Sequence, residues 1–265
     1  MRLVRFTLDP ALPAATPDTS PLVKYGVVED RTVFETGALW EGRNGAAWPL
    51  QEVRLLPPCW PSKIVCVGRN YHEHAQELGN PVPAEPLIFL KPPSALAAHG
   101  DPVVCPRLSA RVDYEGELGV VIGRRARRVR PEQAAQYILG YTCVNDVTAR
   151  DLQKKDGQWT RAKGFDTFCP VGPWIVPAEH LSPQALRLRT WLNGEKVQEA
   201  STAEMIFSVA EIIAYVTAVM TLEPGDLIST GTPAGVGPMA PGAVVRVEIE
   251  GLGVLENPVR AEPAT

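Results

Sequence analysis

The stretch that decides the fold is "VDYEGELGVVIG", residues 112–123. Asp113, Glu115 and Glu117 occupy alternate positions in it, and this two-residue period predicts a β-strand with the three acids on one face. From Leu118 onward the segment is apolar, which predicts burial on both faces. Carboxylates beside a core are costly unless a cation meets them, and the stretch itself contains none. The pattern therefore raises the question of which cation completes the site.

The composition is that of an ordinary globular protein and excludes several function classes. With 265 residues, 45% of them hydrophobic, the chain fits one large domain or a main domain with a small appendage. Its net charge of −4 argues against nucleic acid or an anionic membrane as the partner. The apolar runs are shorter than the roughly 20 residues that span a bilayer, and no signal-peptide layout is visible. The five scattered cysteines form no C-x-x-C pair, so we expect reduced thiols and a cytoplasmic location.

Proline-rich "LLPPCWPSK", residues 55–63, predicts a linker near residue 57. We expect a small N-terminal β-rich domain over 1–56 and a catalytic domain over 57–265. The sequence predicts strands at 1–8, 63–68, 86–92, 113–123, 141–145 and 244–259, a hairpin about Glu29–Asp30, an irregular segment over 38–54, and helices within 69–79, 130–140 and 209–220. Ser208 and Glu211 form a capping-box pattern before the last helix. Strands dominate, which indicates a β-rich α+β fold.

A third acid accompanies Glu115 and Glu117. Asp146 follows the strand-like "YTCVN", as a ligand at the end of a buried strand would. Three carboxylates that leave positions open for water suit a hard cation such as Mg²⁺ or Mn²⁺. The alternative is an acidic strand face in contact with solvent, and the apolar flanks argue against it.

Other polar segments are candidates for catalysis. His74 and Glu77 are three residues apart in "GRNYHEHAQELG" and would share a helix face, where Glu77 can orient the imidazole as a general base. The segment is not an H-E-x-x-H motif, and an exposed polar helix face is its alternative. Lys163 can neutralise a substrate anion or can simply be solvated. The Gly- and Thr-rich "LISTGTPAGVGP", residues 227–238, can cradle a carboxylate or can be a structural turn.

Taken together, these segments resemble the fumarylacetoacetate hydrolase family. The strings that carry the resemblance occur in the family's order over most of 60–250: "KIVCVGRNYHEHAQELG", "PLIFLKPPSAL", "YEGELGVVIG", "GYTCVNDVTARDLQ", "KGFDTFCPVGP", "WLNGEKVQEASTAEMIFSVAEIIAYV" and "LEPGDLISTGTPAGVGP". One departure is "KPPSAL", where many members read K-P-S-T-A, and it can change the pocket wall near Ser94.

The resemblance implies a mixed β-roll catalytic domain with a small N-terminal β appendage, a homodimer, and a bound Mg²⁺ or Mn²⁺. It implies Glu115, Glu117 and Asp146 as the metal ligands, which would answer the opening question. The remaining implied residues are His74 and Glu77 as an acid–base pair on a mobile lid, Lys163 facing the substrate, Gln153 and Thr232 holding substrate oxygens, and Arg69, Asn70 and Tyr71 lining the pocket.

The first expectation for function is a metal-dependent isomerase or decarboxylase of 2-hydroxy-dienoate or 2-oxo carboxylic acids, similar to the 2-hydroxyhepta-2,4-diene-1,7-dioate isomerase of aromatic catabolism. An acylpyruvate hydrolase and an oxaloacetate decarboxylase are alternatives that use the same residues. A non-catalytic binding protein on the same fold is the alternative of another class. In each case the expected ligand is a small-molecule acid.

Overall fold

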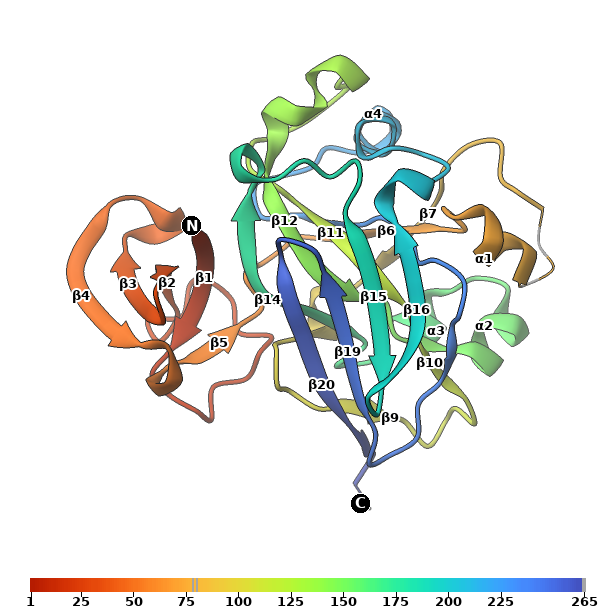
Figure 1. Ribbon diagram of the computed structural model, residues 1–265, viewed down its shortest axis with the longest axis horizontal. Helices are drawn as coiled ribbons and strands as arrows, with labels where there is room; N and C mark the ends of the chain where they lie inside the picture. The colour runs from red at the N-terminus through yellow and green to blue at the C-terminus, as the bar shows by residue number, and fades with distance from the viewer. Residues whose placement is uncertain (78, 80, 264–265) are drawn as a thin grey trace.

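The structure, a computed structural model, describes residues 1–77, 79 and 81–263. Strands prevail over helices (Figure 1), which confirms the predicted β-rich α+β class. No helix within the described residues is both long and apolar enough to cross a bilayer.

The largest sheet has 12 strands and runs through the whole molecule. Its order is β4 (Arg43–Pro49), β3 (Thr32–Thr36), β2 (Lys24–Glu29), β1 (Arg2–Thr7), β14 (Cys169–Pro177), β12 (Ile138–Asn145), β11 (Gly116–Ile122), β17 (Leu227–Ser229), β6 (Ile64–Gly68) and β7 (Leu87–Lys91), with β5 (Arg54–Leu56) beside β1 and β8 (Leu96–Ala97) beside β14. The central strand β11 is buried along its whole length, as its apolar sequence predicts.

Two smaller sheets complete the fold. One joins β16 (Glu195–Ser201), β15 (Arg187–Leu192), β19 (Val244–Ile249), β20 (Gly253–Ala261) and β9 (Val103–Cys105); the other joins β13 (Thr148–Ala149), β10 (Val112–Tyr114) and β18 (Gly237–Pro238). The α-helices are α1 (His72–Glu77), α2 (Arg150–Asp156), α3 (Thr160–Lys163) and α4 (Val209–Val219). The short 3₁₀ helices within the described residues are η1 (Ala38–Trp40), η2 (Leu50–Glu52), η3 (Pro93–Ala95), η4 (Pro131–Tyr137), η5 (Ala178–His180) and η6 (Thr202–Glu204).

The acidic stretch changes sheets at Glu115. β10 pairs with β13 and β18 before this residue, and β11 pairs with β12 and β17 after it. At the junction the Glu115 amide donates to the side chain of Asn145, and the Asp146 amide donates to the Glu115 carbonyl. The prediction of one continuous strand over 113–123 is therefore wrong, because the two halves pair with different partners.

The N-terminal segment forms β1–β5, which lie at the left of Figure 1. β1 also pairs with β14, with Leu3 opposite Ile175, so the main sheet continues into this segment. The predicted division into 1–56 and 57–265 stays a prediction. The expected irregular segment over 38–54 is wrong, since it contains β4. That strand is mostly exposed and shows no apolar alternation, so only its pairing with β3 reveals it.

The helix predicted within 130–140 is shorter than expected and is not an α-helix. Residues 131–137 form the 3₁₀ helix η4, and Ile138–Gly140 already belong to β12. Gly140 lies opposite Pro177 of β14, and a Cβ at Gly140 would lie 2.2 Å from the Val176 carbonyl oxygen. The close approach of the strands therefore requires glycine here. The helix predicted within 69–79 is shorter than expected, because α1 spans only His72–Glu77, and residue 78 lies outside the described residues.

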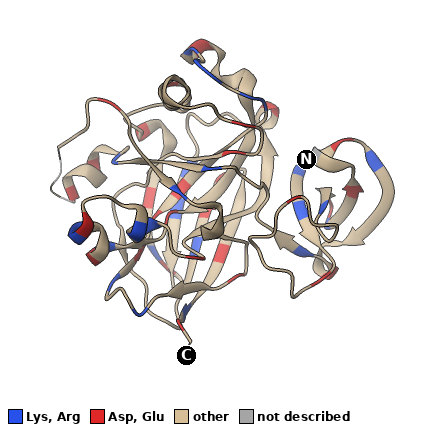
Figure 2. Ribbon diagram, turned by 180° about the vertical axis from the view of Figure 1, so that it is seen from behind, with Lys and Arg blue, Asp and Glu red and all other residues tan. Residues whose placement is uncertain are grey.

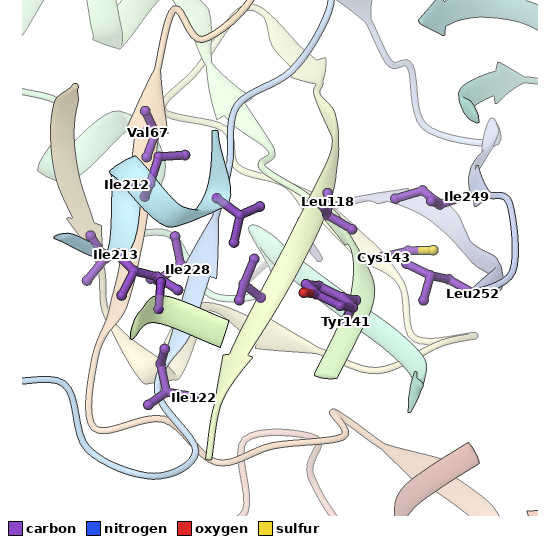
Figure 3. Packing of buried hydrophobic residues seen from close by; sticks show 14 of the residues in the cluster. Val67, Leu118, Ile122, Tyr141, Cys143, Ile212, Ile213, Ile228, Ile249 and Leu252 are labelled. Atoms are coloured by element: carbon purple, nitrogen blue, oxygen red, sulfur yellow. The ribbon is translucent and has the colours of Figure 1, made fainter. Parts of the chain in front are cut away.

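Helix α4 packs over the core that supports β11 and β12. Figure 3 shows Ile212 and Ile213 of α4 in the same cluster as Leu118, Ile122 and Tyr141 of the two strands. The apolar face predicted for 209–220 is therefore confirmed. Ser208 caps the helix, since its side chain accepts from the Glu211 amide while the Glu211 carboxylate accepts from the Ser208 amide.

Replacement of the cap should weaken the fold measurably. Ser208→Ala removes the side-chain acceptor at the start of α4, and we expect a loss of about 1 kcal/mol in the free energy of unfolding. Urea denaturation followed by circular dichroism measures this loss. Ser182→Ala, at an exposed position, is the control and should stay within about 0.5 kcal/mol of wild type. Equal stability of the two variants would contradict the capping role.

Candidate functional site

A cavity of about 370 Å³ lies where α1, α2 and α3 meet the ends of the strands that bear the acids. Nine of the residues predicted for the site line it: Arg69, His74, Glu77, Glu115, Glu117, Asp146, Gln153, Lys163 and Thr232. Viewed from behind, α2 and α3 bring basic residues up to these strands (Figure 2). The fold therefore gathers into one cavity residues from eight separate elements and loops of the chain.

Three carboxylates converge at this cavity. One oxygen from each of Glu115, Glu117 and Asp146 can be chosen such that all three atoms lie within 4.8 Å of one another, and all three residues are buried. Glu115 lies at the junction between β10 and β11, Glu117 lies two residues further along β11, and Asp146 follows the end of β12. The backbone pairing of β11 with β12 holds the three positions together. The sequence therefore predicted this grouping correctly, although it did not reveal the break in the strand.

Basic side chains from elsewhere in the chain compensate the buried negative charge. The ammonium Nζ of Lys163 donates to Glu115 Oε2 at 2.8 Å and to Asp146 Oδ2 at 2.6 Å. The Lys91 Nζ atom donates to Asp146 Oδ1 at 2.5 Å. Lys163 thus binds two of the expected metal ligands directly, which brings it to the centre of the cluster and not only to the substrate side.

Arg150, at the start of α2, connects the row of acids. Its Nη2 donates to Glu115 Oε1 at 2.5 Å, and its Nε donates to Asp113 Oδ2 at 2.9 Å. The Nη1 atom donates to Gln153 Oε1 at 2.7 Å, which orients that amide toward the cavity that it lines. Asp113 also pairs with Arg111 and is not one of the three converging carboxylates.

The two glutamates differ in their electrostatic environment. Burial together with the negative charges of Asp146 and Glu115 raises the pKa of Glu117 well above its usual value. Burial also acts against the ionisation of Glu115, but Lys163 and Arg150 outweigh it and lower the pKa of that carboxyl. No cation among the described residues donates to Glu117. Its Oε2 instead accepts from Ser229 Oγ at 2.5 Å and from the Gly231 amide at 2.8 Å.

The donor set fits a hard divalent cation. Carboxylate oxygens are the ligands that Mg²⁺ and Mn²⁺ prefer. One oxygen of each of the three carboxylates lies within 4.8 Å of the others, so a single cation could contact all three. The raised pKa of Glu117 reflects its burial and the neighbouring charges of Asp146 and Glu115. A cation beside these acids would favour the ionised form of Glu117.

His74 and Glu77 form the predicted pair. The imidazole Nδ1 lies 3.2 Å from Glu77 Oε2 on α1, and His74 is buried at the cavity wall. The other carboxylate oxygen of Glu77 accepts from the Gly235 amide at 3.0 Å. With Nδ1 donating to Glu77, the Nε2 atom of His74 is left to exchange a proton. The alternative of a fully exposed polar helix face does not hold for His74.

Two of the predicted substrate-binding residues lie behind the cavity. Asn70 is fully buried, where its side chain bonds the backbone of Phe207 and Thr230. Tyr71 is also buried and makes a β-bridge to Met205. Neither is among the described residues that line the cavity, so their role in binding stays a prediction.

Sequence reasoning missed several residues of the site. Lys91 and Arg150 are two of the three cations described above that contact the acids. Trp159 with Phe89 forms an aromatic wall with ring centroids 5.1 Å apart. A lysine that ends the apolar run "LIFLK" is a signal that could have identified Lys91. Arg150 has no such signal, because only the fold brings it to Glu115.

Loss of Lys91 should destabilise the protein strongly. Lys91→Met leaves a buried oxygen of Asp146 without its cation, and we expect a loss of about 3–5 kcal/mol in the free energy of unfolding. Urea denaturation in a buffer that contains a metal chelator measures this loss of free energy. Arg125→Met removes the exposed ion pair of Arg125 with Glu223 and should cost less than about 1 kcal/mol. Similar costs for the two variants would contradict the buried role of Lys91.

Glu117→Gln should become more stable than the wild-type protein as the pH rises. Because the pKa of Glu117 is raised on folding, its ionisation in the unfolded chain reduces stability above the usual carboxyl pKa. Glutamine does not ionise, so the stability of the variant relative to wild type should grow between about pH 5 and about pH 7, by at most about 1.4 kcal/mol per pH unit. Urea denaturation at both pH values, in buffers that contain a metal chelator, measures this stability difference. A stability difference that does not change with pH would be evidence that Glu117 is ionised without metal.

Comparison with known proteins relates this geometry to a family. Residues 63–260 match the family model described as fumarylacetoacetate (FAA) hydrolase C-terminal, and residues 1–58 match one described as Rv2993c-like, N-terminal. A protein of Archaeoglobus fulgidus is 56% identical over 81% of this chain and 85% of its own. The 2,4-didehydro-3-deoxy-L-rhamnonate hydrolase of a Sphingomonas strain is 44% identical over 88% of this chain and 86% of its own. The mitochondrial oxaloacetate tautomerase fahd2 of Xenopus laevis is 44% identical over 77% of this chain and 67% of its own.

Solved structures are similar along the whole chain. The 2-hydroxyhepta-2,4-diene-1,7-dioate isomerase from Mycobacterium marinum superposes with a TM-score of 0.87 at 47% identity, covering 100% of both chains. The maleylpyruvate hydrolase from Sphingobium sp. SYK-6, solved with manganese(II) and pyruvate, superposes with a TM-score of 0.80 at 33% identity, covering 99% of this chain and 100% of its own. Isomerases, hydrolases and a tautomerase thus share this fold, and the chain belongs to the fumarylacetoacetate hydrolase family.

Proposed function

We propose that the protein is a divalent-metal-dependent isomerase or decarboxylase of 2-hydroxy-dienoate or 2-oxo carboxylic acids. The observation that carries this proposal is the group of three buried carboxylates within 4.8 Å at a cavity that also contains the His74–Glu77 pair. The similarity to the Mycobacterium marinum isomerase over the full chain supports the same reaction class.

Glu115, Glu117 and Asp146 would hold the metal, which we propose to be Mg²⁺ or Mn²⁺. The bound cation supplies a Lewis acid that stabilises negative charge on the oxygens of a 2-oxo acid. The manganese(II) in the related maleylpyruvate hydrolase supports this choice of metal class. The chain provides the remaining charge balance through Lys163 and Arg150, whose positions limit how much net charge the cavity carries.

The polar residues of the cavity wall would bind and orient the acid substrate. Gln153 presents an amide at the wall, Thr232 lines it with its hydroxyl bonded to Gly116 and Gln198, and Arg69 adds a positive charge that suits a carboxylate. The aromatic rings of Phe89 and Trp159 exclude water from one side of the cavity. These contacts would fix the substrate between the carboxylate cluster and α1.

His74 would move the proton. In the isomerisation of a dienol acid, Nε2 takes the proton of the 2-hydroxyl group and returns a proton to a carbon of the conjugated chain, so that the keto form results. In the decarboxylation of a β-keto acid, the C–C bond to the leaving carboxylate breaks, carbon dioxide departs, and a proton from His74 converts the enolate carbon to C–H. Glu77 stabilises the protonated imidazole in both reactions.

A second candidate is a hydrolase of acylpyruvates. The Sphingomonas relative is named a hydrolase and is 44% identical over 88% of this chain. Glu77 remains about one-third exposed, so water can reach the pair, and His74 can remove a proton from a water molecule that attacks the acyl carbon. The products would then be a free acid and pyruvate, which distinguishes this reaction from isomerisation.

A turnover assay on metal-stripped protein tests the proposal. The substrates are oxaloacetate, acetylpyruvate and a 2-hydroxydienoate diacid, each with and without added Mg²⁺ or Mn²⁺. We expect metal-dependent conversion of the dienoate or release of carbon dioxide from oxaloacetate. Cleavage of acetylpyruvate alone would favour the hydrolase. Failure of the wild-type protein to bind either metal would refute the proposed centre.

Two variants separate catalysis from mere binding. Glu115→Gln should lose metal affinity, and His74→Ala should lose about 10²–10⁴-fold in kcat because the proton carrier is gone. Glu73→Gln, one residue before His74 on the exposed side of α1, is the matched control and should keep wild-type turnover. Unchanged turnover in His74→Ala would count against the proposed proton transfer. If cells that carry Glu115→Gln or His74→Ala behave like cells that carry the wild-type protein, the protein would instead act by binding alone.

A further inference from the structure

One buried side chain joins the acidic strand to the loop that contacts α1. Gln198 lies on β16 of the five-stranded sheet and is only 3% exposed. Its Oε1 accepts from the Gly116 amide at 3.1 Å, while its Nε2 donates to Thr232 Oγ1 and to the Pro233 carbonyl, both at 2.9 Å. A single amide therefore contacts two segments that lie more than 100 residues apart in the chain.

The first contact is at the residue between two of the carboxylates. Gly116 separates Glu115 from Glu117, and its amide is held by Gln198 while its carbonyl accepts from Thr232 Oγ1 at 2.9 Å. A Cβ at Gly116 would lie 2.1 Å from Thr190 Oγ1, so the five-stranded sheet approaches this backbone closely. The side chain of Gln198 therefore helps to fix the position of the backbone between Glu115 and Glu117.

The second contact leads to the His74–Glu77 pair. The segment from Thr232 to Gly235 rests on β16, since a Cβ at Gly235 would lie 2.2 Å from the Val197 carbonyl oxygen. The Gly235 amide donates to Glu77 Oε1, and the Gly235 carbonyl accepts from the Tyr114 hydroxyl at 2.9 Å. Gly235 has a φ of +98°, which favours glycine at this position. Displacement of this loop would therefore move the partner of the imidazole.

We propose that Gln198 is a positioning residue that couples the geometry of the carboxylate centre to the placement of the His74–Glu77 pair. This inference rests on the proposed function, because it assumes that Glu115 and Glu117 bind the metal and that His74 carries the proton. Gln198 is not among the described residues lining the cavity, so it acts through Gly116 and Thr232 and does not touch substrate.

The chemistry of the amide explains why glutamine suits this position. Gln198 accepts one hydrogen bond and donates two, and every bond is at a buried or nearly buried atom. Methionine has a similar length but neither accepts nor donates these hydrogen bonds, so it would leave the Gly116 amide and Thr232 without their partners. Outer residues that orient metal ligands in this way commonly change metal affinity by about 10–100-fold when they are replaced.

The test measures Mn²⁺ binding and α1 order in the full-length protein. Isothermal titration with Mn²⁺ alone gives the dissociation constant, and hydrogen exchange of residues 71–77 reports on α1. For Gln198→Met we expect Mn²⁺ affinity to fall at least about tenfold and exchange in α1 to accelerate at least about threefold. Thr142→Val is the matched control, since its hydroxyl is buried in β12 without a hydrogen-bond partner in the described structure, and both readouts should match wild type.

Gly235→Ala perturbs the coupling from the side of the loop. Its Cβ would lie 2.2 Å from the Val197 carbonyl oxygen and 3.3 Å from Gln198 Cγ, so both the loop and the Gln198 side chain would shift, and we expect α1 exchange to accelerate and Mn²⁺ affinity to fall. If Gln198→Met does not fold, Thr232→Val removes one link of the same network and should weaken Mn²⁺ binding about threefold or more.

The outcomes distinguish this inference from the proposed function. Wild-type protein that binds no Mn²⁺ would overturn both. Wild-type protein that binds Mn²⁺, together with a folded Gln198→Met that binds it equally and keeps α1 protected, would overturn only the role of Gln198. Loss of Mn²⁺ affinity with unchanged α1 exchange would overturn the coupling, since Gln198 would then serve the carboxylates alone.

Discussion

Three carboxylates meet at one buried point, and the surrounding structure has to compensate their charge. Lys91 comes from the end of β7, Arg150 from the start of α2 and Lys163 from the end of α3, and each donates to one or two of these acids. An uncompensated buried charge would cost several kcal/mol, so these elements can only pack where their cations reach the acids. The positions of α2 and α3 around the cavity follow from this requirement.

The basic side chains compensate the negative charges of the three carboxylates unequally, and this difference matters for function. Glu115 and Asp146 share the Lys163 ammonium, whereas in the part of the chain that the structure describes Glu117 accepts hydrogen bonds only from Ser229 and Gly231. The pKa of Glu117 is therefore raised while that of Glu115 is lowered. A divalent cation next to Glu117 would favour loss of the Glu117 proton, which offsets part of the added positive charge. The same arrangement leaves His74 beside the cluster with its own anionic partner, Glu77.

Much of the site could be predicted from the sequence because its signals are local. The spacing of Glu115 and Glu117, the position of Asp146 after an apolar strand, and the i, i+3 pair of His74 and Glu77 all depend on residues close together in the chain. The capping box of α4 is likewise local, and its prediction is confirmed. The partners of these groups were less predictable, because Arg150 and Lys91 reach the acids across 35 and 55 positions.

The sequence by itself determined the β-rich class, the buried central strand, the helix at α4 and the family resemblance, since apolar periodicity and cap residues act within a few positions. Only the tertiary structure decided the break at Glu115, the strand β4 and the 3₁₀ form of η4, because each depends on backbone hydrogen bonds or strand pairing that no apolar period in the sequence marks. The place of Gln198 between two sheets is of the same kind, because a buried amide has no local pattern and gains its partners only when the sheets pack.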